Sequence, residues 1–444
     1  MNTNPIKKQN FKKLENIVII GNGGRENSLA WAVQKNNQIN NIYLIPGNGG
    51  SEKIKKCRQL EINLENKDLL YKKLIELDID LIIIGPEIPL ANGLGDFLRS
   101  KNFRVFGPNK DGAKLESSKS WAKSLMKEAN IPTANFWRIS TLEEAEKIIS
   151  KSNYPLVVKA DGLASGKGVF IPDSNEEALK ITTEIINGKF GESGRVVLLE
   201  EKIKGPEVSV FAICDGQRYV LLPTAQDHKR IGEKDKGLNT GGMGAYAPAP
   251  LLSNKELASI CKNIIEPTIN ELNNRNIDYR GVLYIGLMIT DSGPKVIEYN
   301  CRFGDPECQT IMPLMDTNFV NLLNKCAIGK LEGNEQIAAT SKVSGCVIAA
   351  SKGYPLDYEI GLPIKFNNPN DDKQQIFHSG TAIDESGQTV TNGGRVLSIV
   401  CQGDNFDSAF DMAYETLNEI YFDGIYYRKD IGHQVRTKYT NDYK

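Results

Sequence analysis

The sequence describes a large globular protein with balanced charge. It has 444 residues, of which 40% are hydrophobic and 25% charged, and 54 basic and 55 acidic side chains give a formal net charge of −1. This length suggests about three domains, and the composition excludes a small disulfide scaffold, a disordered chain and a collagen-like protein. Because no strong overall field would attract nucleic acid or an anionic membrane, we expect any bound anion to be small.

The eight cysteines and three histidines form no recognisable metal-binding pattern, since no C-x-x-C pair occurs. We therefore expect reduced, mostly buried thiols in a cytoplasmic protein. No apolar run approaches the ~18–20 residues of a membrane span. Residues 1–13 contain four lysines and no apolar core of a secretory signal, so they are predicted to be a flexible tail.

The first structured region, residues 14–115, is predicted to be a small α/β domain. Three apolar runs alternate with two helical stretches, at 17–20, 26–34, 42–45, 68–77 and 79–84. Continuous apolar strands that alternate with helices are typical of a parallel sheet covered on both faces.

The rest of the chain predicts two further regions, which makes the protein a multi-domain α/β and α+β chain. Residues 116–340 are predicted to form a central α+β domain, which begins with a helix at 114–129. Its predicted strands lie at 156–159, 196–200, 208–214 and 219–223, and a second helix lies at 175–187. Residues 341–440 are predicted to form a small α+β domain. Its predicted strands lie at 345–350, 375–383 and 395–400, with a turn at 392–394 and a helix at 407–420.

A glycine-rich turn at the end of the first strand is a candidate phosphate site. It consists of Gly21, Asn22, Gly23, Gly24, Arg25 and Glu26 and opens a helix, whose free backbone N–H groups and dipole favour an anion. The turn lacks the third glycine of a dinucleotide fingerprint, and no acid ends the next strand. The alternative is a tight turn with a purely structural role.

A second glycine-rich segment, residues 159–168, contains Lys159 and Lys167 but does not have Walker A spacing. Lys159 ends an apolar strand, where a lone ammonium must find an anion or extend to solvent. The segment is therefore either a phosphate loop of another kind or a surface hairpin with a solvated lysine.

Residues 224–246 are polar and glycine-rich and show neither helical nor strand periodicity, so we expect a long loop. Loops of this length in a compact domain are usually functional or disordered. Asp227 and Lys229, followed by Asn239, Thr240, Gly241 and Gly242, are suited to a phosphorylated sugar and a small charged substrate.

The segment 295–307 is the most specific. A short strand is predicted to end in Glu298 and Asn300, whose side chains alternate onto one face and offer hard oxygen ligands to Mg²⁺. Arg302 follows on the same side, with a guanidinium suited to a carboxylate or a phosphoryl group. The alternatives are a structural hydrogen-bond cluster, or an Arg302 that pairs with Asp305 or Glu307 to brace the turn.

Together these segments resemble the ATP-grasp superfamily and, within it, the glycinamide ribonucleotide synthetase (phosphoribosylamine glycine ligase) family. The resemblance covers nearly the whole chain after Leu14. It rests on the strings IIGNGGRE, IIGPEIPL, FGPNKDGAKLESSK, VVKADGLASGKGV, QDHKRIGEKDKGLNTGGMGAYAPAP, VIEYNCRFGDPECQ and VTNGGRVL. It implies a central ATP-grasp fold with a mobile lid at about 133–200.

The family's reaction is the implied activity. ATP phosphorylates the carboxylate of glycine, and the amine of 5-phosphoribosylamine attacks the glycyl phosphate to give glycinamide ribonucleotide, ADP and phosphate in de novo purine synthesis. Mg²⁺ or Mn²⁺ is implied as cofactor, the protein is expected to be a monomer or weak dimer, and no nucleic-acid or membrane partner is expected. Little covalent chemistry by the protein is needed, which suits a chain without a nucleophile motif.

The resemblance also implies residue roles. Arg302, Lys167 and Asp227 are expected to be catalytic, and Glu298 and Asn300 to bind the metal. ATP is expected to contact Lys159, Lys167, Glu200, Glu201, Ile203 and Glu207. The glycine carboxylate is assigned to Arg302, and the sugar phosphate to the Gly21–Glu26 turn, Asp227, Lys229, Asn239, Thr240, Gly241 and Gly242.

The chain departs from the family pattern at a few positions. Asn27 replaces a usual histidine, Cys308 a common threonine, and Pro206 interrupts a usual Gly-Glu-Glu. Near Gly286 the chain offers no carboxylate, which leaves Glu298 as the main metal acid. Three other functions stay open: a nicotinamide oxidoreductase, a nucleotide-binding protein without turnover, and another carboxylate–amine ligase.

Overall fold

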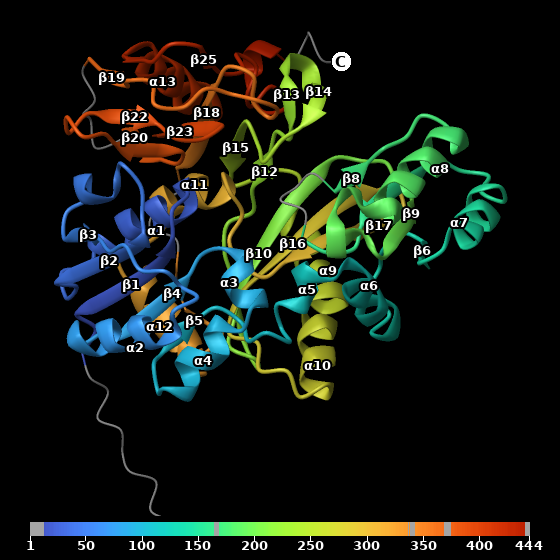
Figure 1. The fold of residues 1–444 in the computed structure, drawn as a ribbon, viewed down its shortest axis with the longest axis horizontal. Helices are drawn as coiled ribbons and strands as arrows, with labels where there is room; N and C mark the ends of the chain where they lie inside the picture. Colours follow the sequence, from blue (N-terminus) through green and yellow to red (C-terminus); the bar gives the residue numbers. More distant parts are fainter. Residues whose placement is uncertain (1–12, 164–167, 336, 338–341, 368–373, 440–444) are drawn as a thin grey trace, which may run out of the picture.

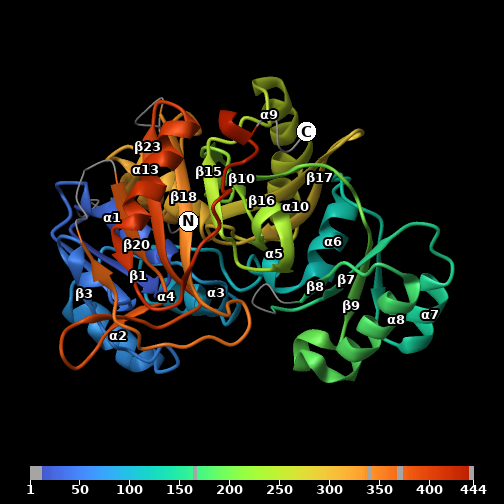
Figure 2. The ribbon, with the colours of Figure 1, turned by 90° about the horizontal axis from the view of Figure 1, so that it is seen from above.

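The computed structural model describes residues 13–163, 168–335, 337, 342–367 and 374–439. Its regions follow the order of the chain in Figure 1: blue for the amino-terminal region, mostly green and yellow for the central region, and orange to red for the carboxyl-terminal region. The carboxyl-terminal region packs against the amino-terminal one, while residues 136–201 extend to the far side of the molecule (Figures 1 and 2).

The amino-terminal region is a five-stranded parallel sheet covered on both faces. Its strand order is β3-β2-β1-β4-β5 (Cys57–Gln59, Asn41–Pro46, Asn16–Gly21, Leu81–Ile84 and Val105–Phe106). Ile17 and Ile19 of β1 belong to one apolar cluster with residues of α1 (Gly24–Gln34) and α12 (Phe319–Ala327). Val18 and Ile20 belong to another with residues of α2 (Lys67–Glu76), α3 (Glu87–Ala91) and α4 (Leu94–Ser100). The predicted doubly covered sheet is confirmed.

The part of the central region farthest from this sheet has a core of its own. Its antiparallel sheet has the order β6-β9-β7-β8 (Phe136–Ile139, Val197–Glu201, Leu156–Ala160 and Val169–Phe170). Helices α7 (Leu142–Ile149) and α8 (Asn175–Glu184) supply apolar side chains to this separate cluster. The helix predicted at 175–187 ends as an α-helix at Glu184, and a π turn over Ile185–Lys189 follows.

The larger part of the central region is a second antiparallel sheet, with the order β11-β10-β16-β17 (Tyr219–Leu221, Glu207–Cys214, Gly281–Thr290 and Gly293–Asn300). Three helices lie beside it: α6 (Lys119–Glu128), α9 (Asn254–Ile260) and α10 (Glu266–Asn274). The single helix predicted at 114–129 is wrong, because Ser118 is extended and separates α5 (Lys114–Ser117) from α6. The Ser118 hydroxyl accepts a hydrogen bond from the Trp121 N–H and so caps α6.

The carboxyl-terminal region is built on a sheet that includes strands from the central part of the chain. Its order is β12-β15-β18-β23-β20 (Gln226–Asp227, Gly244–Ala247, Val343–Ser351, Arg395–Gly403 and Gln374–His378), with β25 (Ile425–Tyr426) also paired to β18. Helix α13 (Phe406–Asn418) covers the sheet, and two small ladders join β19 (Lys365–Phe366) to β24 (Ile420–Tyr421) and β21 (Thr381–Ile383) to β22 (Thr389–Thr391). The strand predicted at 375–383 is therefore two strands.

Residues 224–246 do not form the predicted loop. They contain β12, the start of β15, and a hairpin of β13 (Arg230–Gly232) and β14 (Lys236–Asn239). These strands are too short to show a period-two pattern, and β15 pairs with β18, about a hundred residues later in the chain. Residues near the carboxyl terminus also contact residues 224–246, since the Gly432 N–H donates a hydrogen bond to His228 Nε2 at 3.1 Å.

All eight cysteines are free thiols, and seven of them are buried, as predicted. Within the described residues, no helix has the length and apolar character needed to cross a membrane.

Packing in the carboxyl-terminal region gives a stability prediction. Phe410 of α13 is fully buried, and its ring lies where a side chain at Gly345 or Gly432 would be. We expect Phe410→Ala to lower the free energy of unfolding by about 3–5 kcal/mol, because it leaves a cavity. Tyr421→Ala, at a side chain that is 55% exposed, is the matched control and should change it by less than about 1 kcal/mol. Equal melting temperatures for the two variants would contradict this packing.

Candidate active site

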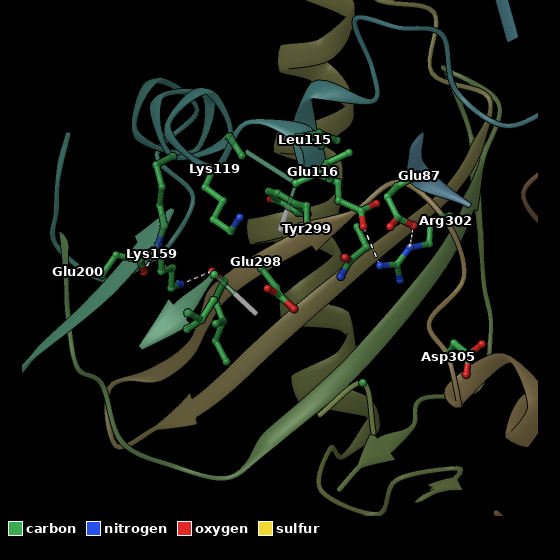
Figure 3. A pocket seen from close by; sticks show the side chains of 18 of the residues that line it. Glu87, Leu115, Glu116, Lys119, Lys159, Glu200, Glu298, Tyr299, Arg302 and Asp305 are labelled. Carbon is green, nitrogen blue, oxygen red and sulfur yellow. Dashed lines mark hydrogen bonds and ion pairs between the residues drawn. The ribbon is translucent and has the colours of Figure 1, made fainter. Parts of the chain in front are cut away.

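A cavity of about 390 Å³ lies among the three regions, and its walls are strongly charged (Figure 3). It brings together residues that are far apart in the sequence, from the α1 turn, α3, α5, α6, β17, β23 and the β6-β9-β7-β8 sheet, which we call the outer sheet. Its charged lining residues are Arg25, Glu87, Glu116, Lys119, Lys123, Lys159, Glu200, Glu298, Arg302, Asp305 and Arg395. Of the predicted site residues, Arg25, Lys159, Glu200, Gly241, Glu298, Asn300 and Arg302 line it.

One end of the cavity holds a carboxylate between two ammonium groups. Lys123 Nζ lies 2.7 Å from Glu200 Oε2, and Lys159 Nζ lies 2.7 Å from Glu200 Oε1, with all three side chains buried. Burial alone would raise the pKa of Glu200, but the two lysines outweigh it and lower that pKa. Burial lowers the pKa of Lys123 to about 8, although Glu200 opposes the shift. This end therefore has two lysines to one carboxylate, and Lys119 also lines the cavity.

The other end holds a guanidinium between two carboxylates. Arg302 Nη2 lies 2.7 Å from Glu116 Oε1, and Arg302 Nε lies 3.3 Å from Glu87 Oε2, as the dashed lines of Figure 3 show. Burial alone would raise the pKa of Glu87, but Arg302 and Arg25 lower it overall, whereas burial dominates at Glu116 and raises its pKa. The alternative that Arg302 pairs with Asp305 or Glu307 is wrong, because acids from α3 and α5 hold its guanidinium.

Between the two ends, β17 presents Glu298 and Asn300 to the cavity. The pairing of β16 with β17 shifts between Gly286 and Leu287, which leaves Ile297 unpaired and sets Glu298 opposite Gly286. A Cβ at Gly286 would lie 3.3 Å from Glu298 Cγ, so glycine leaves room for this carboxylate. Within the described residues, no hydrogen bond or ion pair engages the Glu298 carboxylate, and Figure 3 shows it directed into the cavity.

These oxygens fit a hard divalent cation. The described residues contain no group of three or more His, Cys, Asp or Glu side chains placed to hold a metal by themselves. One carboxylate and one amide oxygen in a polar cavity suit Mg²⁺, which usually takes few protein ligands and completes its coordination with phosphates and water.

The glycine-rich turn places Arg25 in the cavity, but carboxylates already occupy part of the α1 amino terminus. The Gly23 N–H donates to Glu26 Oε2 at 2.8 Å, and the Arg25 N–H donates to Asp305 Oδ2 at 3.3 Å. A side chain at Gly24 would collide with Gln309 and Ser379, which explains glycine there. The predicted phosphate site at this turn stays a prediction, and a phosphate bound to the Arg25 amide would have to displace Asp305.

Several predicted residues do not line the described cavity. Lys229 Nζ forms an ion pair with Glu207 Oε2 at 2.6 Å beside the cavity, and the Thr240 N–H donates to the Lys229 carbonyl at 2.7 Å. Asp227 lies next to this pair, and burial raises its pKa to about 7. The other predicted residues outside the lining are Gly21, Asn22, Gly23, Gly24, Glu26, Glu201, Ile203, Asn239, Thr240 and Gly242. Lys167 lies outside the described residues.

Sequence reasoning missed six charged lining residues. Five of them, Glu87, Glu116, Lys119, Asp305 and Arg395, stand in the strings that carried the resemblance, but no catalytic or binding role was assigned to them. Lys123 had a signal of its own, because it stands among Ala122, Leu125 and Met126 on the buried face of a helix. Asp305 follows Arg302 and pairs with Arg395 Nη1 at 3.2 Å, a contact between regions that local sequence does not predict.

Comparisons with known proteins match one enzyme family over nearly the whole chain. Three family descriptions match in order: the phosphoribosylglycinamide synthetase N domain over residues 15–116, its ATP-grasp (A) domain over 117–308, and its C domain over 344–434. A phosphoribosylamine–glycine ligase from Nostoc sp. is 44% identical over 423 residues, which are 95% of this chain and 100% of the relative.

Solved structures of this family and of other proteins share the fold of this chain. The crystal structure of a phosphoribosylamine–glycine ligase from Thermotoga maritima is 34% identical, with a TM-score of 0.81 over 94% of this chain and 100% of that one. A biotin carboxylase from Campylobacter jejuni, 17% identical, shares the fold with a TM-score of 0.70 over 96% of each chain. The chain therefore belongs to the phosphoribosylglycinamide synthetase family and has its ATP-grasp fold.

Proposed function

We propose that the protein joins glycine to 5-phosphoribosylamine with the cleavage of ATP to ADP and phosphate, giving glycinamide ribonucleotide in de novo purine synthesis. The observation that carries this proposal is one continuous cavity with a cationic end, a carboxylate suited to a metal, and an end where a guanidinium and two carboxylates meet. It occurs in a chain that matches ligases of this name over nearly its full length. We expect the protein to act in the cytoplasm.

The cationic end suits the nucleotide. Lys159, Lys119 and Lys123 place ammonium groups around the predicted phosphate position, and Lys167 is expected to join them. Glu298 and Asn300 would hold Mg²⁺ or Mn²⁺, which neutralises phosphate charge when bound. Positioning and charge neutralisation are the main requirements of phosphoryl transfer.

The Arg302 end suits glycine, which carries a carboxylate and an ammonium group. Arg302 can orient the carboxylate and then the phosphoryl oxygens after the γ-phosphoryl group moves to it. Glu87 and Glu116 hold the guanidinium in place. The amine of phosphoribosylamine then attacks the glycyl carbonyl carbon, the bond to the phosphate oxygen breaks, and phosphate leaves.

The sugar phosphate is expected near the glycine-rich turn and Arg395. Arg395 Nη1 donates to the carbonyls of Gly241 and Asp305, both at 2.7 Å, so it ties the Asn239–Gly242 segment to this end of the cavity. Asp227 and Lys229 lie beside it. We keep Asp227 as a proposed catalytic residue.

The outer sheet, within the predicted lid at about 133–200, is proposed to close over the nucleotide. Its separate hydrophobic cluster supports movement as a unit. Closure would exclude water from an acyl phosphate that would otherwise hydrolyse.

An ADP-release assay with each substrate withheld in turn tests the proposed function. We expect ADP only when ATP, glycine, phosphoribosylamine and Mg²⁺ are all present, together with glycinamide ribonucleotide in the product mixture. Equal ADP release with another amino acid in place of glycine, or nucleotide binding without turnover in the complete mixture, would overturn it.

The metal assignment predicts the effect of one substitution. Glu298→Gln keeps the shape of the side chain but removes its charge, and we expect kcat to fall by about 10²–10³-fold, in line with the loss of other preorganised charge contacts. The Mg²⁺ concentration needed for half-maximal rate should rise. Glu61→Gln, at an exposed acid, is the control and should behave like the parent. Unchanged activity in a correctly folded Glu298→Gln protein would reject the assignment.

The role of Arg302 is tested by Arg302→Lys, which keeps the charge but loses the planar fork. We expect nearly unchanged nucleotide affinity and a large fall in kcat with glycine. Because Glu87 and Glu116 also use this guanidinium, melting temperature must be measured on the same variant. Lost stability with normal turnover per folded molecule would show that Arg302 only braces the two acids.

A further inference from the structure

The β13–β14 hairpin stands between two groups of predicted substrate residues but has little apolar support of its own. Asp227 and Lys229 precede its first strand, and residues 240–242 follow its second. In the described structure none of residues 230–239 is buried, and Ile231 packs only partly buried against the large apolar cluster. Because apolar burial is too small to fix this hairpin, polar contacts must hold it in place.

A buried arginine near the carboxyl terminus supplies several of these contacts. Arg428 is fully buried, and its Nε and Nη2 lie 2.8 Å and 2.9 Å from the two carboxylate oxygens of Asp430. Its Nη1 donates to Asp235 Oδ1 at 2.8 Å and to the Arg230 carbonyl at 3.0 Å. One planar guanidinium therefore joins the carboxyl-terminal segment to the first residue of the hairpin and to its turn.

Two neighbours of Arg428 in the chain also contact the hairpin. Asp430 Oδ2 accepts a hydrogen bond from the Lys234 N–H at 2.7 Å, and the Tyr426 hydroxyl of β25 donates to the Ile231 carbonyl at 2.8 Å. Figure 1 shows β13 and β14 beside the red carboxyl-terminal region. We call Tyr426, Arg428 and Asp430 the carboxyl-terminal clamp, because together they hold the first strand and the turn of the hairpin.

The base of the hairpin leads directly to the active-site cavity. The Lys229 carbonyl accepts hydrogen bonds from the Thr240 N–H at 2.7 Å and from the Thr240 hydroxyl at 2.9 Å, which joins the two chain segments there. Lys229 forms its ion pair with Glu207, and Gly241 lines the cavity, where its carbonyl accepts from Arg395. A displaced hairpin would therefore move Lys229 and Gly241 together.

We propose that Arg428 and Asp430 are positioning residues for the phosphoribosylamine part of the site, because they fix the hairpin that places Lys229 and Gly241. Neither is among the residues that line the described cavity, so they act through the hairpin and not on a substrate. This role rests on the proposed function, which assigns Lys229 and Gly241 to phosphoribosylamine. The cationic end of the cavity is built from α6 and the outer sheet, so the clamp should affect phosphoribosylamine more than ATP.

Arg428→Lys tests this role in the full-length enzyme. Lysine keeps the charge but cannot reach Asp430, Asp235 and the Arg230 carbonyl together, so we expect a looser hairpin. The apparent KM for phosphoribosylamine should rise at least about tenfold, because small displacements of positioning groups are costly, while the KM values for ATP and glycine should change less than about threefold. A purely structural role would lower the melting temperature and the folded fraction without this selective change in KM.

Two further variants keep the test decisive if Arg428→Lys does not fold. Asp235→Asn removes one charged partner at a side chain that is 42% exposed, and asparagine tolerates the φ of 51° at this position. It should raise the KM for phosphoribosylamine about threefold or more, through the loss of a charge-assisted hydrogen bond. Asp411→Asn is the matched control, because Asp411 pairs with the buried Arg436 from α13 and not from the hairpin, and it should leave all three KM values unchanged.

Hydrogen exchange without substrates measures the clamp independently of the reaction. The Lys234 and Thr240 amide protons, which donate to Asp430 and to the Lys229 carbonyl, should exchange faster in Arg428→Lys but not in Asp411→Asn. Unchanged exchange, faster exchange with an unchanged KM for phosphoribosylamine, or an equal rise in the KM for ATP would overturn the proposed role. A parent enzyme that releases no ADP in response to phosphoribosylamine would instead refute the proposed function, and this role with it.

Discussion

The architecture of the cavity depends on how buried charges are compensated. A carboxylate lies between Lys123 and Lys159 at one end, and a guanidinium lies between Glu87 and Glu116 at the other. The first group has two lysines to one carboxylate, and the second has two carboxylates to one guanidinium, with Arg25 also acting on Glu87. Because an isolated buried ion is very costly, each group needs all its members, which come from different elements of the chain. The packing of the three regions is therefore inseparable from the electrostatics of the site.

Under the proposed function, this arrangement divides the substrates between the two ends of the cavity. The nucleotide phosphates would then meet the lysines, and the ammonium group of glycine would meet the acids around Arg302. Glu298 lies between the two ends in Figure 3.

Local sequence was sufficient where the signal was local. The apolar runs of β1 and β4 predicted the parallel sheet, and the alternation of Glu298 and Asn300 placed both in the cavity. It was insufficient where a partner lies far along the chain. Ser118 breaks a helix that propensity alone would continue, and β15 pairs with β18 about a hundred residues later in the chain. The acids around Arg302 could not be identified, because only the tertiary fold brings Glu87 and Glu116 to it.

The pairing of Gly244–Ala247 with Ser344–Val347 has a consequence for synthesis of the chain. A nascent chain that has emerged only to about residue 330 contains the lysines, acids and arginines of most of the cavity, but the strand that follows Asn239–Gly242 has only β12 beside it and still lacks β18. Arg395, which fixes Gly241 against Asp305, emerges later still. The ribosome must therefore release the last quarter of the protein before the cavity wall can close, so an incomplete chain cannot carry a finished site.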